Sequence, residues 1–397
     1  MDVSKHYSSN LKRMKSSEIR DLLAVSQQPG VISFGGGLPN SKAFPVHKIQ
    51  RIVEEIIAEE PNVAFQYGTT KGQPKLREAI VDMAAGEDID ADMDHVLITV
   101  GSQQALDLIG RVFLNPEDTI FLGLPTYLGG INVFRAYGAN MVGVPVDRDG
   151  MNVDILEEKI IEAERNGKPG KLIYTVPTFQ NPAGVEMSAD RRRRIVELAD
   201  EHDLVLLEDD PYGKLRFEGE ALPPLRALSD RVVHMATFSK VLSPGFRLAY
   251  VIAPNGVVDK MELAKQSVDL CTPTFTQCIA RRFITEGHMD EHLPNIINMY
   301  KRKRDIMLDA LEEYFPEGCT WTHPQGGMFL WATLPEHIDT REMFQDAIKE
   351  KVAYVHGRAF YVNGGGGNTM RLNFSNPSDE DVTEGIRRLG ATIQKNL

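Results

Sequence analysis

The sequence predicts an α/β protein with a mainly parallel, seven-stranded sheet flanked by helices and a smaller α+β domain. Short apolar runs rich in Val, Ile and Leu, without strict alternation, suit strands that are covered on both faces. Helical patterns separate these runs, and strands that alternate with helices form crossover units of a parallel sheet. The 397 residues are enough for two domains with a large core.

Each expected strand is a short apolar run. Helices are expected between them, for example over Gln103–Phe113, Val153–Arg165 and Ala189–His202. The seven expected strands are His95–Thr99, Thr119–Leu122, Met141–Val146, Leu172–Val176, Leu204–Leu207, Val232–Ala236 and Leu248–Ala253.

The pattern changes after a long helix that is expected over Met289–Tyr314. Strands near Met328–Thr333 and Arg371–Phe374 then indicate an α+β region. We expect three parts: a large domain at 46–285, a small C-terminal domain at 286–397, and an N-terminal segment at 1–45 that joins the small domain.

Composition narrows the class of function. The net charge of −12 argues against a general nucleic-acid binder, and the basic run at 191–194 is interpreted as a solvated helix face. No apolar run reaches the roughly 20 residues of a membrane span, and no signal peptide opens the chain, so we expect a cytoplasmic protein. Cys271, Cys278 and Cys319 lack the spacing of a zinc site, and no metal is expected.

Ligands of an open parallel sheet bind outside the carboxyl ends of its strands, so the residues that follow strands are the candidates. Gly101 and Ser102 open a helix, where free N–H groups and the helix dipole favour an anion. Ser102 equally suits an ordinary N-cap. Tyr127 follows the next strand, where its ring either faces a planar ligand or packs.

Three acidic residues at 208–210 end a buried strand, which is costly unless they meet protons, a metal or a cation. A metal site would need His202 or His234 to complete it. Alternatively, Asp209 keeps a pyridine nitrogen protonated and Tyr212 donates to a phenolate oxygen.

Lys240 follows a strand among small hydroxyl residues, Thr237 and Ser239, with Arg247 seven residues later. Lysine becomes a nucleophile when burial or a neighbouring cation lowers its pKa, and arginine presents a fixed fork of donors to phosphate. This group therefore suits an imine paired with a phosphate. Asn181 precedes a proline, which holds its amide in a turn.

Taken together, these residues resemble the fold-type-I pyridoxal-phosphate aminotransferases of class I/II, nearly end to end. The motifs that carry the resemblance are the Asp-Asp-Pro-Tyr turn at 209–212, the Asn181-Pro182 turn, Ser239-Lys240 with Arg247, Tyr67-Gly68 with Gly72, Ser102-Gln103, the segment 324–329 (Pro-Gln-Gly-Gly-Met-Phe) and Arg371-Leu372-Asn373-Phe374.

The resemblance implies pyridoxal 5′-phosphate as cofactor, with catalytic roles for Lys240, Asp209 and Tyr212. Lys240 would hold the cofactor as a Schiff base. Each remaining candidate would have a binding role: Asp209 at the pyridine nitrogen, Tyr212 and Asn181 at the phenolate oxygen, Ser102, Gln103, Thr237, Ser239 and Arg247 at the phosphate, Tyr127 stacked on the ring, Tyr67 at the phosphate of the neighbouring subunit, and Arg371 with Asn181 at the substrate α-carboxylate.

The implied reaction moves an amino group between an L-amino acid and a 2-oxo acid by a ping-pong mechanism. Lys240, freed by the substrate amine, would act as general base. One substrate pair is expected to be 2-oxoglutarate and glutamate, and the other amino acid 2-aminoadipate, an aromatic residue or a broad range. The resemblance also implies a homodimer with shared active sites.

Residues 17–23 and 32–40 resemble the branch that contains 2-aminoadipate and kynurenine aminotransferases. In that branch an N-terminal helix covers the pocket, and Arg20 matches an arginine at the distal part of the substrate. An arginine on an amphipathic helix otherwise pairs with surface carboxylates. Gly36 would let the backbone approach the substrate. His356 stands where relatives usually place proline, so specificity can differ.

Three alternatives remain at this point. The same fold and lysine serve lyases, decarboxylases and racemases, which product analysis separates from transaminases. A regulator with an aminotransferase-like sensor would carry a DNA-binding domain, and only a short polar segment precedes the match. A dinucleotide-dependent dehydrogenase lacks support, because no G-x-G-x-x-G follows the first strand.

Overall fold

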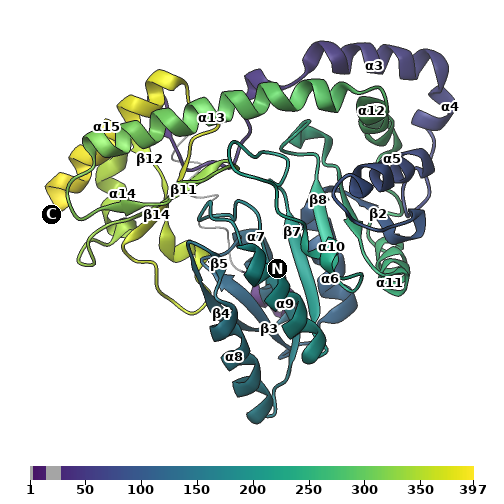
Figure 1. Ribbon diagram of the computed structural model, residues 1–397, viewed down its shortest axis with the longest axis horizontal. Helices are drawn as coiled ribbons and strands as arrows, with labels where there is room; N and C mark the ends of the chain where they lie inside the picture. The colour runs from purple at the N-terminus through teal and green to yellow at the C-terminus, as the bar shows by residue number, and fades with distance from the viewer. Residues whose placement is uncertain (1–2, 15–27) are drawn as a thin grey trace.

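The computed structural model describes residues 3–14 and 28–397. Its main feature is an eight-stranded sheet on which helices pack from both sides (Figure 1). In spatial order the strands are β2 (Val96–Thr99), β9 (Ala249–Ile252), β8 (Val233–Thr237), β7 (Val205–Asp210), β6 (Gly170–Thr175), β3 (Thr119–Leu124), β4 (Asn140–Asp147) and β5 (Gly150–Met151).

The sheet is mainly parallel. The pairs β8–β7, β7–β6, β6–β3 and β3–β4 are parallel, whereas β9 runs antiparallel to both β8 and β2. All seven expected strands are present, which confirms the predicted fold class. The eighth strand, β5, is a two-residue return that pairs antiparallel with the end of β4.

Helices cover both faces of this sheet. Leu106 of α6, Phe134 of α7 and Met261 of α11 belong to the core on one face. Leu156 of α8 and Ile195 of α9 belong to the core on the other face. The helices of this part are α3 (Val46–Glu59), α4 (Pro61–Ala64), α5 (Pro74–Ala85), α6 (Gly101–Phe113), α7 (Leu128–Tyr137), α8 (Val153–Arg165), α9 (Ala189–Glu201), α10 (Leu225–Leu228), α11 (Asn255–Gln266) and α12 (Thr274–Thr285).

A smaller α+β region lies beside the large sheet. The long helix α13 connects the two, running along the upper edge of Figure 1 from α12 to α15. The small sheet has the order β10 (Thr320–Trp321), β11 (Phe329–Thr333), β14 (Thr369–Asn373) and β13 (Val355–His356), and its helices are α13 (His288–Tyr314), α14 (Thr340–Lys349) and α15 (Asp379–Asn396).

The N-terminal residues contact both the large and the smaller region. A short helix, α1 (Ser9–Arg13), contacts α7, and β1 (Ile32–Ser33) pairs in parallel with β12 (Val352–Ala353). The backbone N–H of Phe34 continues this pairing by donating to the carbonyl of Ala353 at 2.8 Å. The domain boundaries at 45 and 285 stay predictions.

The basic run at the start of α9 is only partly a solvated face. Ser188 caps this helix, and Arg191, Arg193 and Arg194 pair with acidic residues at the surface. Arg192 is buried, and its guanidinium donates to the carbonyls of Met187 and Pro177 and to the hydroxyl of Thr178. The sequence interpretation was therefore wrong for this one arginine, because successive helix positions are rotated by about 100° and only one of these four side chains points into the core.

No helix in the described part of the chain is long and apolar enough to cross a membrane.

Candidate active site

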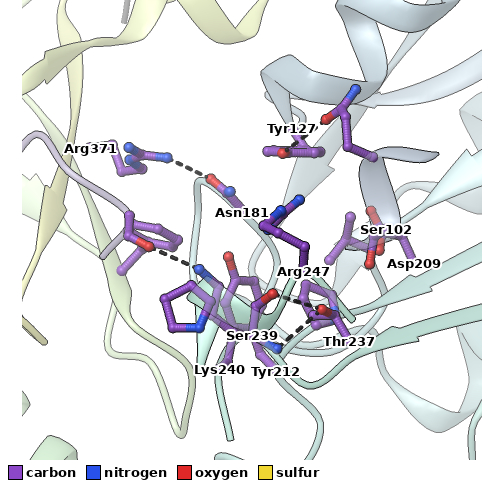
Figure 2. Close-up of a pocket in the computed structure, with 16 residues that line it drawn as sticks. Ser102, Tyr127, Asn181, Asp209, Tyr212, Thr237, Ser239, Lys240, Arg247 and Arg371 are labelled. Atoms are coloured by element: carbon purple, nitrogen blue, oxygen red, sulfur yellow. Dashed lines mark hydrogen bonds between the residues drawn. The ribbon is translucent and has the colours of Figure 1, made fainter. Parts of the chain in front are cut away.

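The carboxyl ends of the central parallel strands and the start of α6 surround a cavity of about 400 Å³. Figure 2 shows its side chains converging from the large sheet on one side and from β14 on the other. The cavity is lined by Gly37, Ser102, Gln103, Tyr127, Val176, Asn181, Asp209, Pro211, Tyr212, Thr237, Ser239, Lys240, Pro244, Arg247, Phe329 and Arg371. Ten of the candidate residues named from the sequence as catalytic or cofactor-binding are among them, together with Arg371.

Lys240 lies just after β8 with its amine inside the cavity. Its Nζ donates to the carbonyl oxygen of Gly37 at 2.9 Å. Burial, and then the positive charges of Arg371 and Arg247, lower the pKa of Lys240 to about 8. A lysine with this pKa is a nucleophile and a base near neutral pH, because a substantial share of its amine is unprotonated.

Asp209 lies near the end of β7 and is buried. Its Oδ2 accepts a hydrogen bond from the hydroxyl of Tyr174 at 2.8 Å, whereas its Oδ1 is buried without a partner among the described residues. Burial raises the pKa of this carboxyl to about 7, although the bond from Tyr174 opposes the shift. An unpaired buried carboxylate oxygen calls for a cation or an N–H donor.

The acidic residues beside Asp209 have partners elsewhere. Glu208 lies 2.9 Å from Nδ1 of buried His234 and accepts from the backbone N–H groups of Leu225 and Arg226. Asp210 accepts from the backbone N–H of Gly213. Within residues 3–14 and 28–397, no three His, Cys, Asp or Glu side chains gather in a way that suits a metal ion.

The part of the cavity at the start of α6 is suited to bind an anion, and it is called the cradle here. Gly101 has φ +71°, and a Cβ there would lie 2.4 Å from Nη2 of Arg247, so only glycine lets the guanidinium approach. The hydroxyl oxygen of Ser102 is buried without a partner in the described part of the chain. Thr237 donates to Ser239 at 3.0 Å and thereby holds both hydroxyls beside this helix start. Unpaired donors, a cation and a helix N-terminus together suit a phosphate.

Two tyrosines flank the space between this cradle and Lys240. Tyr127 caps the start of α7, and its hydroxyl donates to Oε1 of Gln103 at 3.4 Å. Tyr212 is buried, with its ring edge-on to Phe329 at 5.9 Å, and burial raises the pKa of its phenol. Tyr212 therefore stays protonated and able to donate.

Arg371 extends from β14 toward the turn that follows β6. Its guanidinium donates to Oδ1 of Asn181 at 3.0 Å (Figure 2). It also donates to the carbonyl of Gly35 at 2.8 Å. Its Cζ lies 4.2 Å from the centroid of the Phe329 ring. No carboxylate pairs with Arg371 among the described residues, so a bound carboxylate would be its first anionic partner.

Two of the predicted binding residues do not line the cavity. Tyr67 is 81% exposed at the surface. Gly36 lines a separate hollow, and Gly37, one residue on, faces the cavity instead. Arg20 lies outside the described residues. His356 is buried on β13, where it pairs with Met370 beside Arg371.

Sequence reasoning did not single out Tyr174, Gly37 or Phe329 as site residues. Gly37 and Phe329 lie in two segments that carry the family resemblance, 32–40 and 324–329. Their position in these segments was the only feature of the sequence that could have indicated a role in the site. Tyr174 lies inside a buried apolar strand, where a tyrosine is typically a packing residue.

The fold and the site define a pyridoxal-phosphate enzyme. A lysine with a lowered pKa, a phosphate cradle, a buried acid and an arginine surround one cavity. Within the described part of the chain, the acid has one oxygen without a partner and the arginine has no carboxylate partner. The unpartnered atoms of Asp209 and Ser102 fit the ring nitrogen and the phosphate of that cofactor, and Lys240 fits its aldehyde.

The chain belongs to the aminotransferase class I and II family, whose model matches residues 31–389. It is 49% identical to the aromatic-amino-acid aminotransferase 1 of Thermococcus litoralis, over 100% of this chain and 96% of the relative. It is 38% identical to the 2-aminoadipate transaminase of Thermus thermophilus, over 96% of this chain and 95% of the relative. The crystal structure of Pyrococcus horikoshii kynurenine aminotransferase superposes with a TM-score of 0.97 at 48% identity, covering 100% of this chain and 98% of that one.

These similarities confirm the family, its branch and the fold class predicted from the sequence. The protein is an amino-acid transaminase, and pyridoxal 5′-phosphate is its cofactor.

Proposed function

We propose that this transaminase moves the amino group of an L-amino acid to a 2-oxo acid by a ping-pong mechanism, with 2-oxoglutarate and glutamate as one substrate pair. The observation that carries the proposal is Arg371, a buried cation without a carboxylate partner in the described chain, beside Lys240 in one cavity. A single clamp of this kind suits the α-carboxylate that both an amino acid and a 2-oxo acid possess. The two therefore bind in turn at the same place.

The polar residues of the cavity divide into groups with different proposed tasks. Ser102, Gln103, Thr237, Ser239 and Arg247 hold the cofactor phosphate, Tyr127 lies against its ring, Asp209 meets its ring nitrogen, and Tyr212 and Asn181 meet its phenolate oxygen. When bound, the cofactor supplies the electron sink that stabilises negative charge at the substrate Cα. Lys240 removes and returns the proton at that atom, as its lowered pKa allows.

For the second substrate we propose 2-aminoadipate, an aromatic amino acid or a broad range that includes both. The names of the relatives support this choice, since they include an aromatic-amino-acid aminotransferase and a 2-aminoadipate transaminase. Gly36 and Arg20 remain proposed contacts to the distal part of the substrate, Arg20 by pairing with a carboxylate or stacking on a ring.

The decisive experiment is half-reaction spectroscopy on the purified enzyme. Each of 2-aminoadipate, glutamate, kynurenine, phenylalanine, tyrosine, leucine and methionine is added alone, and conversion of the cofactor to its amine form is followed by absorbance. Glutamate and at least one aromatic amino acid or 2-aminoadipate should convert it and yield their 2-oxo acids. Release of ammonia with pyruvate, or loss of carbon dioxide, would instead indicate the lyase or decarboxylase alternative.

We further propose a cytoplasmic homodimer in which Tyr67 reaches the phosphate in the partner subunit. An exposed aromatic surface around this residue supports it: Tyr67 is 81% and Phe65 67% exposed, and the ring of Phe65 stacks on Phe275 at 5.8 Å. Sedimentation of wild type and of Phe65→Glu tests the proposal. The wild type should sediment as a dimer and the variant as a monomer of low activity, whereas a fully active monomer would refute it.

A further inference from the structure

Tyr174 lies directly behind the cavity rather than in its lining. It is a residue of β6, fully buried, and its hydroxyl donates to Oδ2 of Asp209 at 2.8 Å. In the sheet register its partner on β7 is Leu207, two residues before Asp209. Tyr174 is absent from the residues that line the cavity, but its hydroxyl bonds to Asp209, which does line it.

The ring of Tyr174 is held firmly by α7. Phe134 packs edge-on against it, with the ring centroids 5.4 Å apart. On the same helix, a Cβ added to Gly130 would lie 3.1 Å from Cε1 of Tyr174 and 3.4 Å from its hydroxyl oxygen. The absence of a side chain at Gly130 therefore leaves space for the tyrosine ring, and the helix determines where its hydroxyl lies.

The hydrogen bond makes the two oxygens of Asp209 unequal. Oδ2 is occupied by Tyr174, and Oδ1 is buried without a partner among the described residues. Burial favours the neutral acid, while the hydrogen bond from Tyr174 favours the charged carboxylate. The other charged groups near Asp209 have hydrogen-bond partners of their own. His234 lies against Glu208, and Asp210 accepts from the backbone N–H of Gly213.

We propose that Tyr174 is a positioning residue, which holds Asp209 by Oδ2 so that the charged Oδ1 is available to the ring nitrogen of the cofactor. This inference rests on the proposed role of Asp209 at that nitrogen. It assigns to a strand tyrosine the task of fixing both the orientation and the ionisation of the acid.

The test uses Tyr174→Phe, which keeps the packed ring and removes only the hydroxyl. The full-length chain is stripped of cofactor and titrated, with fluorescence as readout, with pyridoxal phosphate and with its 1-deaza analogue, in which a C–H replaces the ring nitrogen. The variant should bind pyridoxal phosphate about tenfold more weakly, the size of a hydrogen bond to a charged group. Its affinity for the analogue should stay within about twofold of wild type. An equal loss for both ligands, or no loss, would overturn the inference.

Tyr354→Phe is the matched control. Tyr354 is also fully buried, also packs edge-on against a phenylalanine (Phe344, 5.5 Å), and also donates its hydroxyl, here to the carbonyl of Thr340. This variant loses a buried hydrogen bond of a residue that does not line the cavity, so it should be less stable while binding both ligands as wild type does. If it weakened pyridoxal phosphate selectively as well, the effect of Tyr174→Phe would be structural and the inference would fail.

Two further variants separate this inference from the assignment of Asp209. Asp209→Asn should abolish the preference for pyridoxal phosphate over the analogue, and adding Tyr174→Phe to it should change nothing more, as expected when two residues act as one unit. If Asp209→Asn kept the preference, the proposed role of Asp209 would fail too. If Asp209→Asn lost the preference and Tyr174→Phe kept it, only the role of Tyr174 would be refuted.

Gly130→Ala provides a test that does not delete the hydroxyl. The new methyl group must displace the ring of Tyr174, whereas the helix itself gains stability from alanine. The preference for pyridoxal phosphate should fall in this variant as well, by less than in Tyr174→Phe. An unchanged preference, with the Tyr174 ring shown to have moved by crystallography, would contradict the inference.

Discussion

The guanidinium of Arg371 donates to Oδ1 of Asn181 at 3.0 Å, and this bond joins the small sheet to the turn that follows β6 of the large one. The two residues are 190 positions apart in the chain. Their contact places the proposed carboxylate clamp over the cavity, with the amide of Asn181 between the clamp and the ring of Tyr212. The clamp therefore depends on how both parts of the molecule pack.

Arg371→Lys should raise KM for amino acids and lower kcat/KM. A lysine keeps the charge but cannot present two parallel donors to a carboxylate. We expect a loss of about 2 kcal/mol, or roughly thirtyfold in kcat/KM. Steady-state kinetics measures it, with Arg216→Lys as control: Arg216 also lies over a phenylalanine ring (Phe179, 4.8 Å) but pairs with Glu186 outside the cavity. A loss of similar size in the control would indicate a general packing effect.

Lys240→Ala should abolish turnover and the visible absorbance of the lysine-bound cofactor. The fold should persist, since Nζ makes one hydrogen bond among the described residues, to the carbonyl of Gly37, and the phosphate cradle should still retain some cofactor. Absorbance spectra and circular dichroism test these expectations. Lys214→Ala serves as control, because Lys214 pairs with Glu87 away from the cavity and its loss should leave turnover intact. Continued transamination by Lys240→Ala would refute the assignment.

The rate at which the cofactor-free chain takes up pyridoxal phosphate should depend on pH through Lys240. Only the neutral amine attacks an aldehyde, and the pKa of Lys240 is lowered to about 8 by burial and by Arg371 and Arg247. The rate should therefore rise with pH below about 8 and level off above it. Stopped-flow absorbance between pH 6 and 10 measures the midpoint. A midpoint near the ordinary lysine value of about 10.4 would contradict the electrostatic account.

Gly101→Ala should weaken cofactor binding more than it destabilises the fold. The residue has φ +71°, and its new Cβ would meet the guanidinium of Arg247. Gly167→Ala is the matched control, with φ +69° and nothing within 4 Å of the added carbon. Both variants should lose about 1 kcal/mol of stability from backbone strain, but only Gly101→Ala should lose affinity for pyridoxal phosphate. Equal affinity in the two variants would contradict the cradle at α6.

Most of the site was predictable because it follows strands. Lys240, Asp209 and Tyr127 come directly at or after apolar runs, and parallel strands place their carboxyl ends at one edge. Seven of the eight strands of the large sheet were predicted for a related reason, since burial on both faces leaves continuous Val, Ile and Leu. The two-residue strand β5 is too short to leave such a pattern.

What the sequence could not predict depends on backbone direction and on packing between elements. Gly36 and Gly37 are indistinguishable as letters, yet the backbone turns only Gly37 toward the cavity. Tyr174 can be recognised as a site residue only from the register of β6 on β7, which brings its hydroxyl to Asp209. In the sequence, Arg192 cannot be distinguished from its three basic neighbours. Only the orientation of α9 shows that its guanidinium lies against the carbonyls of Met187 and Pro177.

The glycine segment at 35–37 affects how substrates bind and how products leave. Its carbonyls at Gly35 and Gly37 accept hydrogen bonds from Arg371, the proposed carboxylate clamp, and from Lys240, the proposed base. When a substrate carboxylate binds Arg371, the arginine exchanges the Gly35 carbonyl for the carboxylate as its acceptor. The binding free energy then contains only the difference between these two hydrogen bonds. The carbonyl of Gly35 therefore occupies the position of a substrate carboxylate at Arg371. We expect the carbonyl of Gly35 to accept from Arg371 again when a product leaves, which favours exchange between successive substrates over tight retention of either one.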